Sequence, residues 1–366
     1  MSLRKSVFFL FLIFQAVGPW GNSPSAIAAS FPIPLQQQLA VVGRDLLIKR
    51  EYQEAEKMFR QMIQDYPDNL LGYFAMMSLY QVQNLENFDF RFEQNYEPWQ
   101  KEGRKRAVKI YNSNSASPWE LLVAGGALGV SGFDKAHRGD WWGGLNDGVM
   151  AIRLLRKAKF SDPQFADADL GIGLYEYWRS VFTKRLWFLP FFADRRTIGI
   201  AAVHNAMDHG HFTPILATMA LSFIHVEEKK EEEALSLLEE LLQQVPQNII
   251  LKTLYGSTLS HQKKFDMAEK EFRQILAIDP AITKTHLHLA INGVRQQKNL
   301  DEASRELDLF FQDCRQNQWL ATGHFYRGEI AALKNEKAQA IQEYKTALRY
   351  NKKIPGPKKR LAELEK

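Results

Sequence analysis

The stretch IILKTLYGSTLSHQKKFDMAEKEFRQILAIDPAI, from Ile249 to Ile282, decides the fold. Gly256 has no side chain, so a second helix can approach the first one closely here, and Ala268 provides the matching small residue on that second helix. Phe272 lies one turn beyond Ala268 on the same face and is placed to fill the space between neighbouring units. Pro280 cannot continue a helix and disfavours the helical conformation of the residue before it. The stretch therefore predicts two antiparallel helices followed by a stop.

The same residue types recur along the chain at a nearly fixed period. Ala234 and Pro246 precede Ala268 and Pro280 by 34 residues each (268 minus 234, 280 minus 246). Matching sets are found upstream, at Gly43, Ala55, Phe59 and Pro67, and downstream, at Ala303, Leu307, Ala340, Tyr344 and Ala347. This ordered series of small, small, aromatic and proline residues resembles the tetratricopeptide repeat (TPR). The first aromatic residue of that family pattern is missing, because Lys252 occupies its place.

The resemblance and the composition imply the same fold class. Of the 366 residues, 45% are hydrophobic, which is enough for a large core and too many for a disordered chain. Segments rich in Ala, Leu, Glu, Lys and Gln, without alternation of period two, favour helices throughout. We therefore expect an all-α protein: a TPR-like α-solenoid, which is a right-handed superhelix of helix-turn-helix repeats, with a divergent central region that contains inserts.

The repeat register divides the chain into five segments. We expect a signal peptide at 1–29, a first TPR unit at 30–69, a divergent helical repeat region with aromatic inserts at 70–214, further TPR units at 215–354 and a C-terminal helix or tail at 355–366. Within the divergent region, two stretches are expected to be inserted loops. Gly132–Gly144 combines bulky tryptophans with glycines, and Ser180–Arg196 contains a run of aromatic residues with basic flanks.

A second resemblance lies in the divergent region. The runs Asp169–Tyr177 and Phe188–Arg196 are similar to a central signature of exported bacterial TPR proteins. This similarity supports the repeat interpretation and implies no enzymatic activity. We therefore expect a scaffold or adaptor that mediates protein–protein interaction, with a role in the assembly or trafficking of envelope components.

The first residues have the pattern of a secretory signal. Arg4 and Lys5 precede an apolar run from Val7 to Val17, and Ala26 and Ala28 form the small-x-small site that signal peptidase cuts. A stable membrane span needs about 20 apolar residues, and this run is shorter. We therefore expect an exported protein, periplasmic or secreted, with an uncleaved membrane anchor as the alternative.

The resemblance also implies where a partner binds. In TPR proteins the first helices of stacked units line the concave side of the superhelix, and that groove is the default binding surface for a protein or peptide. The inward-facing positions of the family, carried onto this sequence, are Gln37, Arg44, Ser257, Ser260, His261, Lys284, Arg295 and Glu329. The Lys and Asn with which chaperone-binding relatives hold a C-terminal carboxylate are absent, because those positions hold Ala40 and Arg44, or Thr253 and Ser257. A net charge of only +5 does not indicate a nucleic-acid partner, and the oligomeric state is left open.

The aromatic insert adds Trp187 and Phe191 as candidate partner-binding residues. Aromatic side chains with basic flanks can anchor in the groove of a protein partner or lie at a membrane interface. A third interpretation is that the insert folds back and covers the core of the solenoid itself. The sequence leaves these three interpretations open.

The alternative function is a membrane-associated or metal-binding module centred on the aromatic insert and on the segment His204–His211. His204 and Asp208 would share one face of a helix, whereas His209 and His211 are expected in the following turn, where histidines interact well with the helix C-terminus. The sequence contains no H-E-x-x-H, G-x-S-x-G or P-loop motif. We therefore expect no catalytic residues, no metal ligands and no cofactor.

Overall fold

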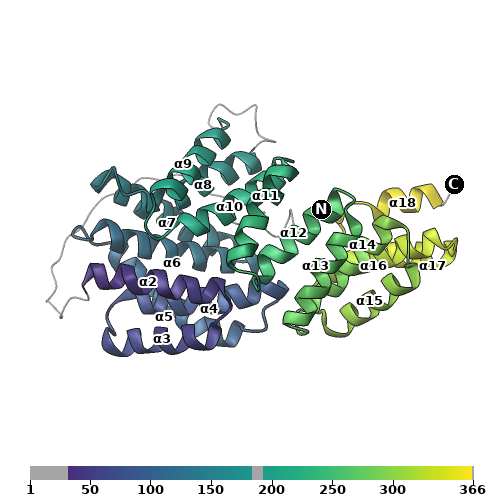
Figure 1. Cartoon of the computed structure of the whole chain (residues 1–366), viewed down its shortest axis with the longest axis horizontal. Coiled ribbons are helices and arrows are strands. Elements are labelled where there is room, and N and C mark those ends of the chain that lie inside the picture. The colour runs from purple at the N-terminus through teal and green to yellow at the C-terminus, as the bar shows by residue number, and fades with distance from the viewer. Residues whose placement is uncertain (1–31, 184–192, 365–366) are drawn as a thin grey trace. The chain divides into compact units, whose positions relative to one another are not determined.

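The computed structural model describes residues 32–183 and 193–364 of the chain. Within these residues every regular element is a helix, and none is a strand. The 17 helices of this part, shown in Figure 1, are α2 (Ile33–Ile48), α3 (Tyr52–Asp65), α4 (Leu70–Asn87), α5 (Glu93–Tyr111), α6 (Pro118–His137), α7 (Trp141–Ser161), α8 (Asp167–Thr183), α9 (Arg196–His209), α10 (Pro214–Glu227), α11 (Glu231–Gln244), α12 (Ile249–His261), α13 (Phe265–Ile278), α14 (Lys284–Gln296), α15 (Leu300–Asp313), α16 (Asn317–Leu333), α17 (Lys337–Tyr350) and α18 (Pro357–Leu364). The predicted all-α fold is confirmed. The expected signal peptide, Trp187 and Phe191 lie outside the described residues.

The chain divides into two compact units. The first unit comprises Met1–Asn84 and Phe90–Lys230, and the second unit comprises Leu85–Asp89 and Glu231–Lys366. In Figure 1 the helices of the second unit from α11 onward run from green to yellow. The repeat register does not reveal this division, because Leu85–Asp89 joins the second unit through spatial contacts rather than through its place in the sequence.

The second unit is built from helical hairpins. Helices α12 and α13, α14 and α15, and α16 and α17 pack as pairs, and α14 also packs against α12 and α16. The Asn248 side chain caps the start of α12 by accepting a hydrogen bond from the backbone N–H of Leu251 (3.0 Å). Helix α13 ends at Ile278, two residues before Pro280, as the proline predicts. The two antiparallel helices predicted for Ile249–Ile282 are thus confirmed.

In each of three hairpins, a glycine of the first helix packs against an aromatic ring of the second. A Cβ atom added at Gly256 would lie 2.8 Å from Cε1 of Phe272, and the ring of Phe272 is only 1% exposed. The same pair recurs with a spacing of 16 residues (272 minus 256, 59 minus 43, 344 minus 328) at Gly43 with Phe59 and at Gly328 with Tyr344. The Phe272 ring also stacks on His288 of α14, with ring centroids 5.4 Å apart. One aromatic residue therefore joins the two helices of its own hairpin and the next hairpin.

We expect Gly256→Ala to destabilise the second unit. Alanine has the better helix propensity, by up to about 1 kcal/mol, but the added methyl would meet a buried ring, and such overpacking costs about 1–3 kcal/mol. The melting temperature measured by calorimetry should fall. The matched control is Gly129→Ala on α6, where an added Cβ has no atom within 4 Å, so stability should stay or rise. Equal melting temperatures for the two variants would contradict this packing.

The helix pairs of the first unit approach each other at glycines on both sides. A Cβ atom at Gly132 would lie 2.9 Å from the carbonyl oxygen of Gly144, and one at Gly173 would lie 2.6 Å from that of Gly199. The backbones of α6 and α7, and those of α8 and α9, therefore touch where these glycines meet. Any larger residue would separate the helices.

The expectation of an inserted loop at Gly132–Gly144 is therefore wrong. Helix α6 continues to His137 and α7 begins at Trp141, so only residues 138–140 lie between them. The glycines that suggested a flexible loop are instead the places where the two helices cross. The second expected insert is shorter on both sides than Ser180–Arg196, because α8 continues to Thr183 and α9 begins at Arg196.

A buried carboxylate joins three helices of the first unit. The side chain of Asp147 on α7 is fully buried and accepts hydrogen bonds from Arg104 of α5 (2.8 and 3.0 Å) and from Lys135 and Ser131 of α6 (2.6 and 2.7 Å). Burial acts to raise the pKa of Asp147, but the hydrogen bonds from these donors outweigh it and hold the pKa below its usual value. A carboxyl group with a lowered pKa in the folded state stabilises the fold above its unfolded pKa. That contribution is lost as the pH falls through the folded pKa.

Replacing Asp147 by Asn should destabilise the first unit at pH 7, because it leaves Arg104 and Lys135 facing a neutral group. Removing one partner of a buried ion pair costs about 3–5 kcal/mol, and we expect the lower end of that range because both cations are partly exposed. Denaturant unfolding followed by circular dichroism measures the change. Asp301→Asn is the control, since Asp301 also pairs with a lysine but its side chain is 83% exposed. This control should change stability little, and an Asp147→Asn protein as stable as the control would refute the assignment.

Candidate partner-binding face

The first helices of the second unit stand in a row. Helix α14 packs against α12 on one side and α16 on the other, and we call these three helices the first-helix row. Six of the residues that the family register predicted to bind a partner lie on it: Ser257, Ser260 and His261 on α12, Lys284 and Arg295 on α14, and Glu329 on α16. The structure brings some of these together and separates others.

Three predicted residues meet at the C-terminal ends of α12 and α14. Arg295 donates a hydrogen bond to Oγ of Ser260 (3.1 Å), and its Nη2 lies 3.3 Å from Nε2 of His261. His261 is exposed and Arg295 is half-buried, so this cluster can be reached from solvent. The Oγ of Ser257, one turn earlier on α12, is buried and has no hydrogen-bond partner among the described residues. The cluster therefore brings polar side chains of two neighbouring hairpins together, with Arg295 as the donor in both contacts.

Lys284 lies at the opposite end of α14, at its first residue. It is only 4% exposed, and its Nζ lies 3.7 Å from the ring centroids of both Phe88 and Trp319. The ammonium thus lies against two aromatic rings, which is a favourable cation–π arrangement. It has no hydrogen-bond acceptor within the described part of the chain. Burial lowers the pKa of Lys284 well below its usual value.

The segment Leu85–Asp89 provides one of those rings. The backbone N–H of Lys284 donates to Oδ1 of Asn87 (2.9 Å), and the ring of Phe88 meets that of Trp319 edge-on, with centroids 6.0 Å apart. Sequence reasoning missed this contact. The only signal was that the aromatic stretch after Asn84 fits no standard turn between repeats.

Glu329 is bound within the second unit. It accepts hydrogen bonds from the hydroxyl of Tyr344 on α17 (2.5 Å) and from Nε and Nη2 of Arg360 on α18 (2.8 and 2.5 Å). Burial and the hydrogen bond to Glu329 raise the pKa of Tyr344. The carboxylate of Glu329 therefore attaches the terminal helix α18 to the last hairpin.

We expect Glu329→Ala to loosen α18, because Arg360 then loses its less exposed carboxylate partner. Hydrogen–deuterium exchange followed by mass spectrometry should show faster amide exchange in Pro357–Leu364. Glu363→Ala is the matched control, since it removes the other, more exposed carboxylate that Arg360 contacts (3.2 Å). Unchanged exchange in α18 of Glu329→Ala would show that other contacts hold this helix.

The two candidates on α2 lie in the first unit and are placed differently. Arg44 donates to the carbonyl oxygen of Phe212 and to Oδ1 of Asp45 (2.8 Å), and its guanidinium lies 5.6 Å from the Phe212 ring centroid. Phe212 in turn packs edge-on against Trp119. Arg44 thus attaches α2 to the turn before α10, while Gln37 is half-buried on the same helix.

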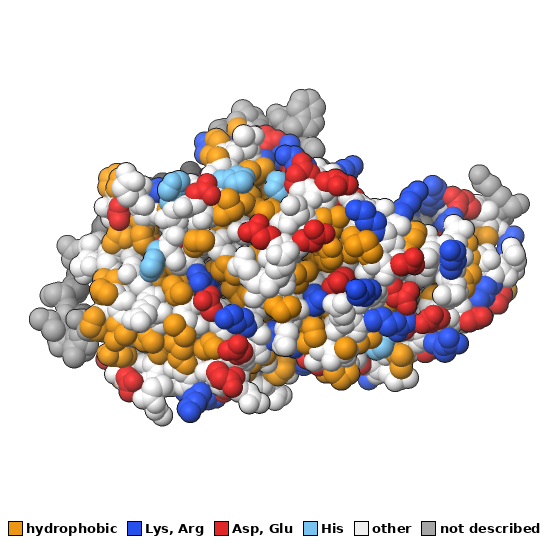
Figure 2. Space-filling view, viewed as in Figure 1, with side chains coloured by type: hydrophobic (Ala, Val, Ile, Leu, Met, Phe, Trp, Pro, Cys, Tyr) orange, Lys and Arg blue, Asp and Glu red, His pale blue; other side chains and the backbone are white. Residues whose placement is uncertain are grey.

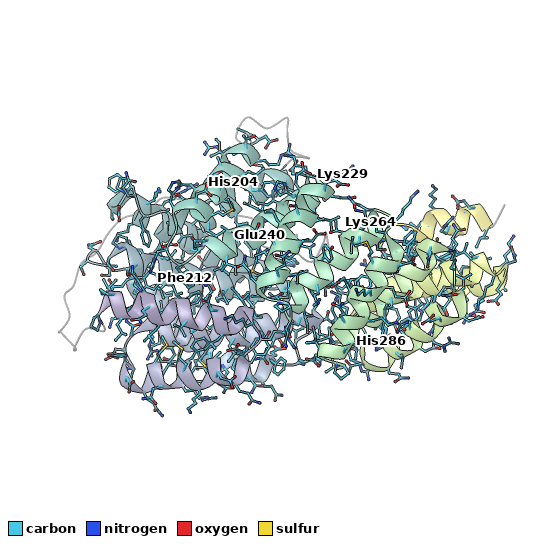
Figure 3. All side chains as sticks on the ribbon, in the orientation of Figure 1. His204, Phe212, Lys229, Glu240, Lys264 and His286 are labelled. Atoms are coloured by element: carbon cyan, nitrogen blue, oxygen red, sulfur yellow. The ribbon has the colours of Figure 1, made fainter. Side chains whose placement is uncertain are left out.

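The alternative site around His204–His211 does not form a ligand cluster in the described residues. The side chains of His204, His209 and His211 are exposed, and His204 is labelled in Figure 3. Within residues 32–183 and 193–364, no group of three His, Cys, Asp or Glu side chains is arranged to hold a metal ion. Over the same residues, no helix combines the length and the apolar character needed to cross a membrane.

Stacked helical hairpins with a polar cluster on their first helices define the class of helical-repeat interaction scaffolds. A family model described as tetratricopeptide repeat matches residues 225–286, which include α11, α12 and α13. The chain therefore contains tetratricopeptide repeats, as the spacing of Gly256, Ala268 and Phe272 predicted. Proteins built on this scaffold are typically non-enzymatic.

Solved structures show the same fold. The chain is similar to a chain in the crystal structure of the APC/C hetero-tetramer Cut9–Hcn1, with a TM-score of 0.62 and 13% sequence identity. The matched region comprises 91% of this chain and 57% of that chain. It is also similar to the human IFIT1 dimer with PPP-AAAA, with a TM-score of 0.50, 13% identity, and coverage of 92% of this chain and 86% of the other. At such identities the likeness establishes the fold alone. No curated protein sequence matches this chain.

Proposed function

We propose that this chain is an exported scaffold without enzymatic activity, which holds a protein or peptide partner against the first-helix row of its second unit. The observation that supports this proposal is the cluster of Ser260, His261 and Arg295, in which two successive hairpins bring polar side chains to one place. Repeat scaffolds bind partners along such rows because each hairpin adds a few side chains to one continuous surface.

The chemistry of the cluster indicates what the partner offers. The guanidinium of Arg295 has five N–H donors. One donates a hydrogen bond to Ser260, and a second points at His261. The guanidinium remains charged at any physiological pH. A carboxylate or a pair of backbone carbonyl oxygens on the partner would satisfy its remaining donors. Basic and acidic side chains are intermixed on the face of the second unit seen in Figure 2, so a single-sign partner such as nucleic acid finds no extended basic surface there.

Export to the periplasm or the medium is part of this proposal. It is supported by the basic start, the apolar run and the small-x-small site within residues 1–29. Such a location would place the scaffold among envelope components whose assembly or trafficking it serves. Neither a cofactor nor catalytic turnover is needed for this role.

Site-specific photo-crosslinking in cells tests the proposal. A benzoylphenylalanine at His261, on the first-helix row, should crosslink to a discrete partner, because this exposed side chain borders the donor cluster. The same amino acid at Lys270, which is exposed on the second helix α13, is the control and should give no such product. Arg295→Glu should reduce the His261 product at least about tenfold, since it reverses the charge at the centre of the cluster.

Equal products from positions 261 and 270, or a product at 261 that is unchanged by Arg295→Glu, would contradict the proposed binding face. Mass spectrometry of the product identifies the partner. The melting temperature of Arg295→Glu must match that of the unmodified protein for the comparison to hold.

A further inference from the structure

The first-helix row already carries a segment of this chain. Leu85–Asp89 belongs to the second unit, and its side chains reach both α14 and α16. Asn87 is 6% exposed and contacts the start of α14 with both atoms of its side-chain amide. Its Oδ1 accepts a hydrogen bond from the backbone N–H of Lys284 (2.9 Å), and its Nδ2 lies 3.5 Å from Oγ1 of Thr283. A free N–H at a helix start needs an acceptor. The amide of Asn87 provides it in the way that a bound peptide would.

Next to Asn87, the ring of Phe88 packs in a small site formed by the side chains of Trp319 and Lys284, which we call the seat. The ring of Phe88 meets Trp319 edge-on at 6.0 Å, and Nζ of Lys284 lies 3.7 Å from the centroids of both rings. Trp319 is 3% exposed and Lys284 4% exposed, so this seat is built from side chains that the fold holds in place. The sequence Asn-Phe therefore fits the row through one amide and one ring.

The fit of the segment is nevertheless incomplete. Phe88 has a backbone φ of +51°, a left-handed conformation that bulky residues rarely adopt and that costs conformational energy. Around the seat, polar atoms lack hydrogen-bond partners within the described part of the chain: Nζ of Lys284, Nε1 of Trp319, and both Nε2 and Oε1 of Gln316. Buried polar groups without partners are costly. The carboxylate of Asp89 acts on Lys284 through space and opposes the lowering of its pKa, but Nζ has no hydrogen-bond partner within the described residues. A ligand that places a carboxylate in hydrogen-bond contact with Nζ would remove part of this cost.

We propose that Leu85–Asp89 is a resident ligand of the first-helix row, which a partner segment displaces. The displacing segment carries an Asn followed by an aromatic residue, together with a carboxylate that reaches Lys284. This inference rests on the proposed scaffold function and adds the chemical class of the partner. A ligand can bind only to those molecules in which the covalently attached segment has left the seat. Its apparent affinity is therefore its intrinsic affinity multiplied by the fraction of molecules with an empty seat. A partner segment with low intrinsic affinity therefore does not displace the resident segment.

Peptide binding to the full chain tests the proposal. The probe is a fluorescein-labelled peptide with the sequence of residues 84–91, NLENFDFR, and its binding is followed by fluorescence anisotropy. The double variant Asn87→Ala, Phe88→Ala empties the seat and should bind the probe at least about tenfold more tightly than the unmodified protein. Phe90→Ala is the matched control. Phe90 is also half-buried and aromatic, but its ring contacts His137 in the first unit, so the affinity should equal that of the unmodified protein.

A third variant examines the seat itself. Lys284→Met keeps an unbranched side chain, one atom shorter, and removes the ammonium, so in the emptied protein it should weaken probe binding about tenfold or more. The same loss should follow when Asp89 of the probe is replaced by Asn. An emptied protein that binds the probe no better than the unmodified protein overturns the proposal, and so does binding that is indifferent to Lys284→Met.

The outcome is distinguishable from failure of the scaffold function. If the emptied protein does not bind the probe but position 261 still crosslinks to its partner, the resident-ligand inference fails and the scaffold proposal stands. If both the probe and the crosslink fail, the first-helix row is not a binding face at all. Circular dichroism of each variant excludes unfolding as the cause of lost binding.

Discussion

The architecture depends on one contact, which is the approach of a second helix to the glycine of its first helix. Where Gly256 leaves room, the ring of Phe272 fills the gap, and the same geometry recurs at Gly43 and Gly328. The distance between the two helices of a hairpin is thereby fixed by an absent side chain and a large one. Because the Phe272 ring also stacks on His288, the contact orients the following hairpin too. These apolar contacts help to fix the register of the helices that carry the polar residues of the row.

In the first unit, other residues allow the two helices of a pair to approach closely, and this explains why the repeat pattern is weak there. Glycine faces glycine at the crossings of α6 with α7 and of α8 with α9, so no aromatic residue is needed at the usual position. A buried carboxylate then adds specificity that apolar contacts lack, because Asp147 must meet Arg104 and Lys135 at fixed points. The helical fold is kept while the signature that identifies it is lost.

Sequence reasoning found those parts of the fold that depend on near neighbours in the chain. Ala268, Phe272 and Pro280 specify a hairpin through local spacing, and the structure confirms it. The loop expected at Gly132–Gly144 was wrong because composition cannot distinguish a flexible glycine from one at a helix crossing. Of the candidate site, Ser260, His261 and Arg295 lie close together on the first-helix row, and their part in binding stays a prediction. It could not show that Arg360 binds Glu329, since such partners are brought together only by the fold.

The unusual polarity of α14 gives the strongest reason to assign a binding role to the first-helix row. Lys284, Thr285, His288 and Asn292 are all buried on this one helix. Asn292 donates to the carbonyl oxygen of Phe265, but its Oδ1, Nε2 of His288 and Nζ of Lys284 have no hydrogen-bond partner in the described residues. A purely structural helix at the centre of a stack would be more stable with apolar residues at these positions. Polar groups that cost stability in the isolated fold are characteristic of sites that are satisfied by a ligand. The two ends of α14 differ in accessibility, because Arg295 is half-buried whereas Lys284 is buried against the ring of Phe88.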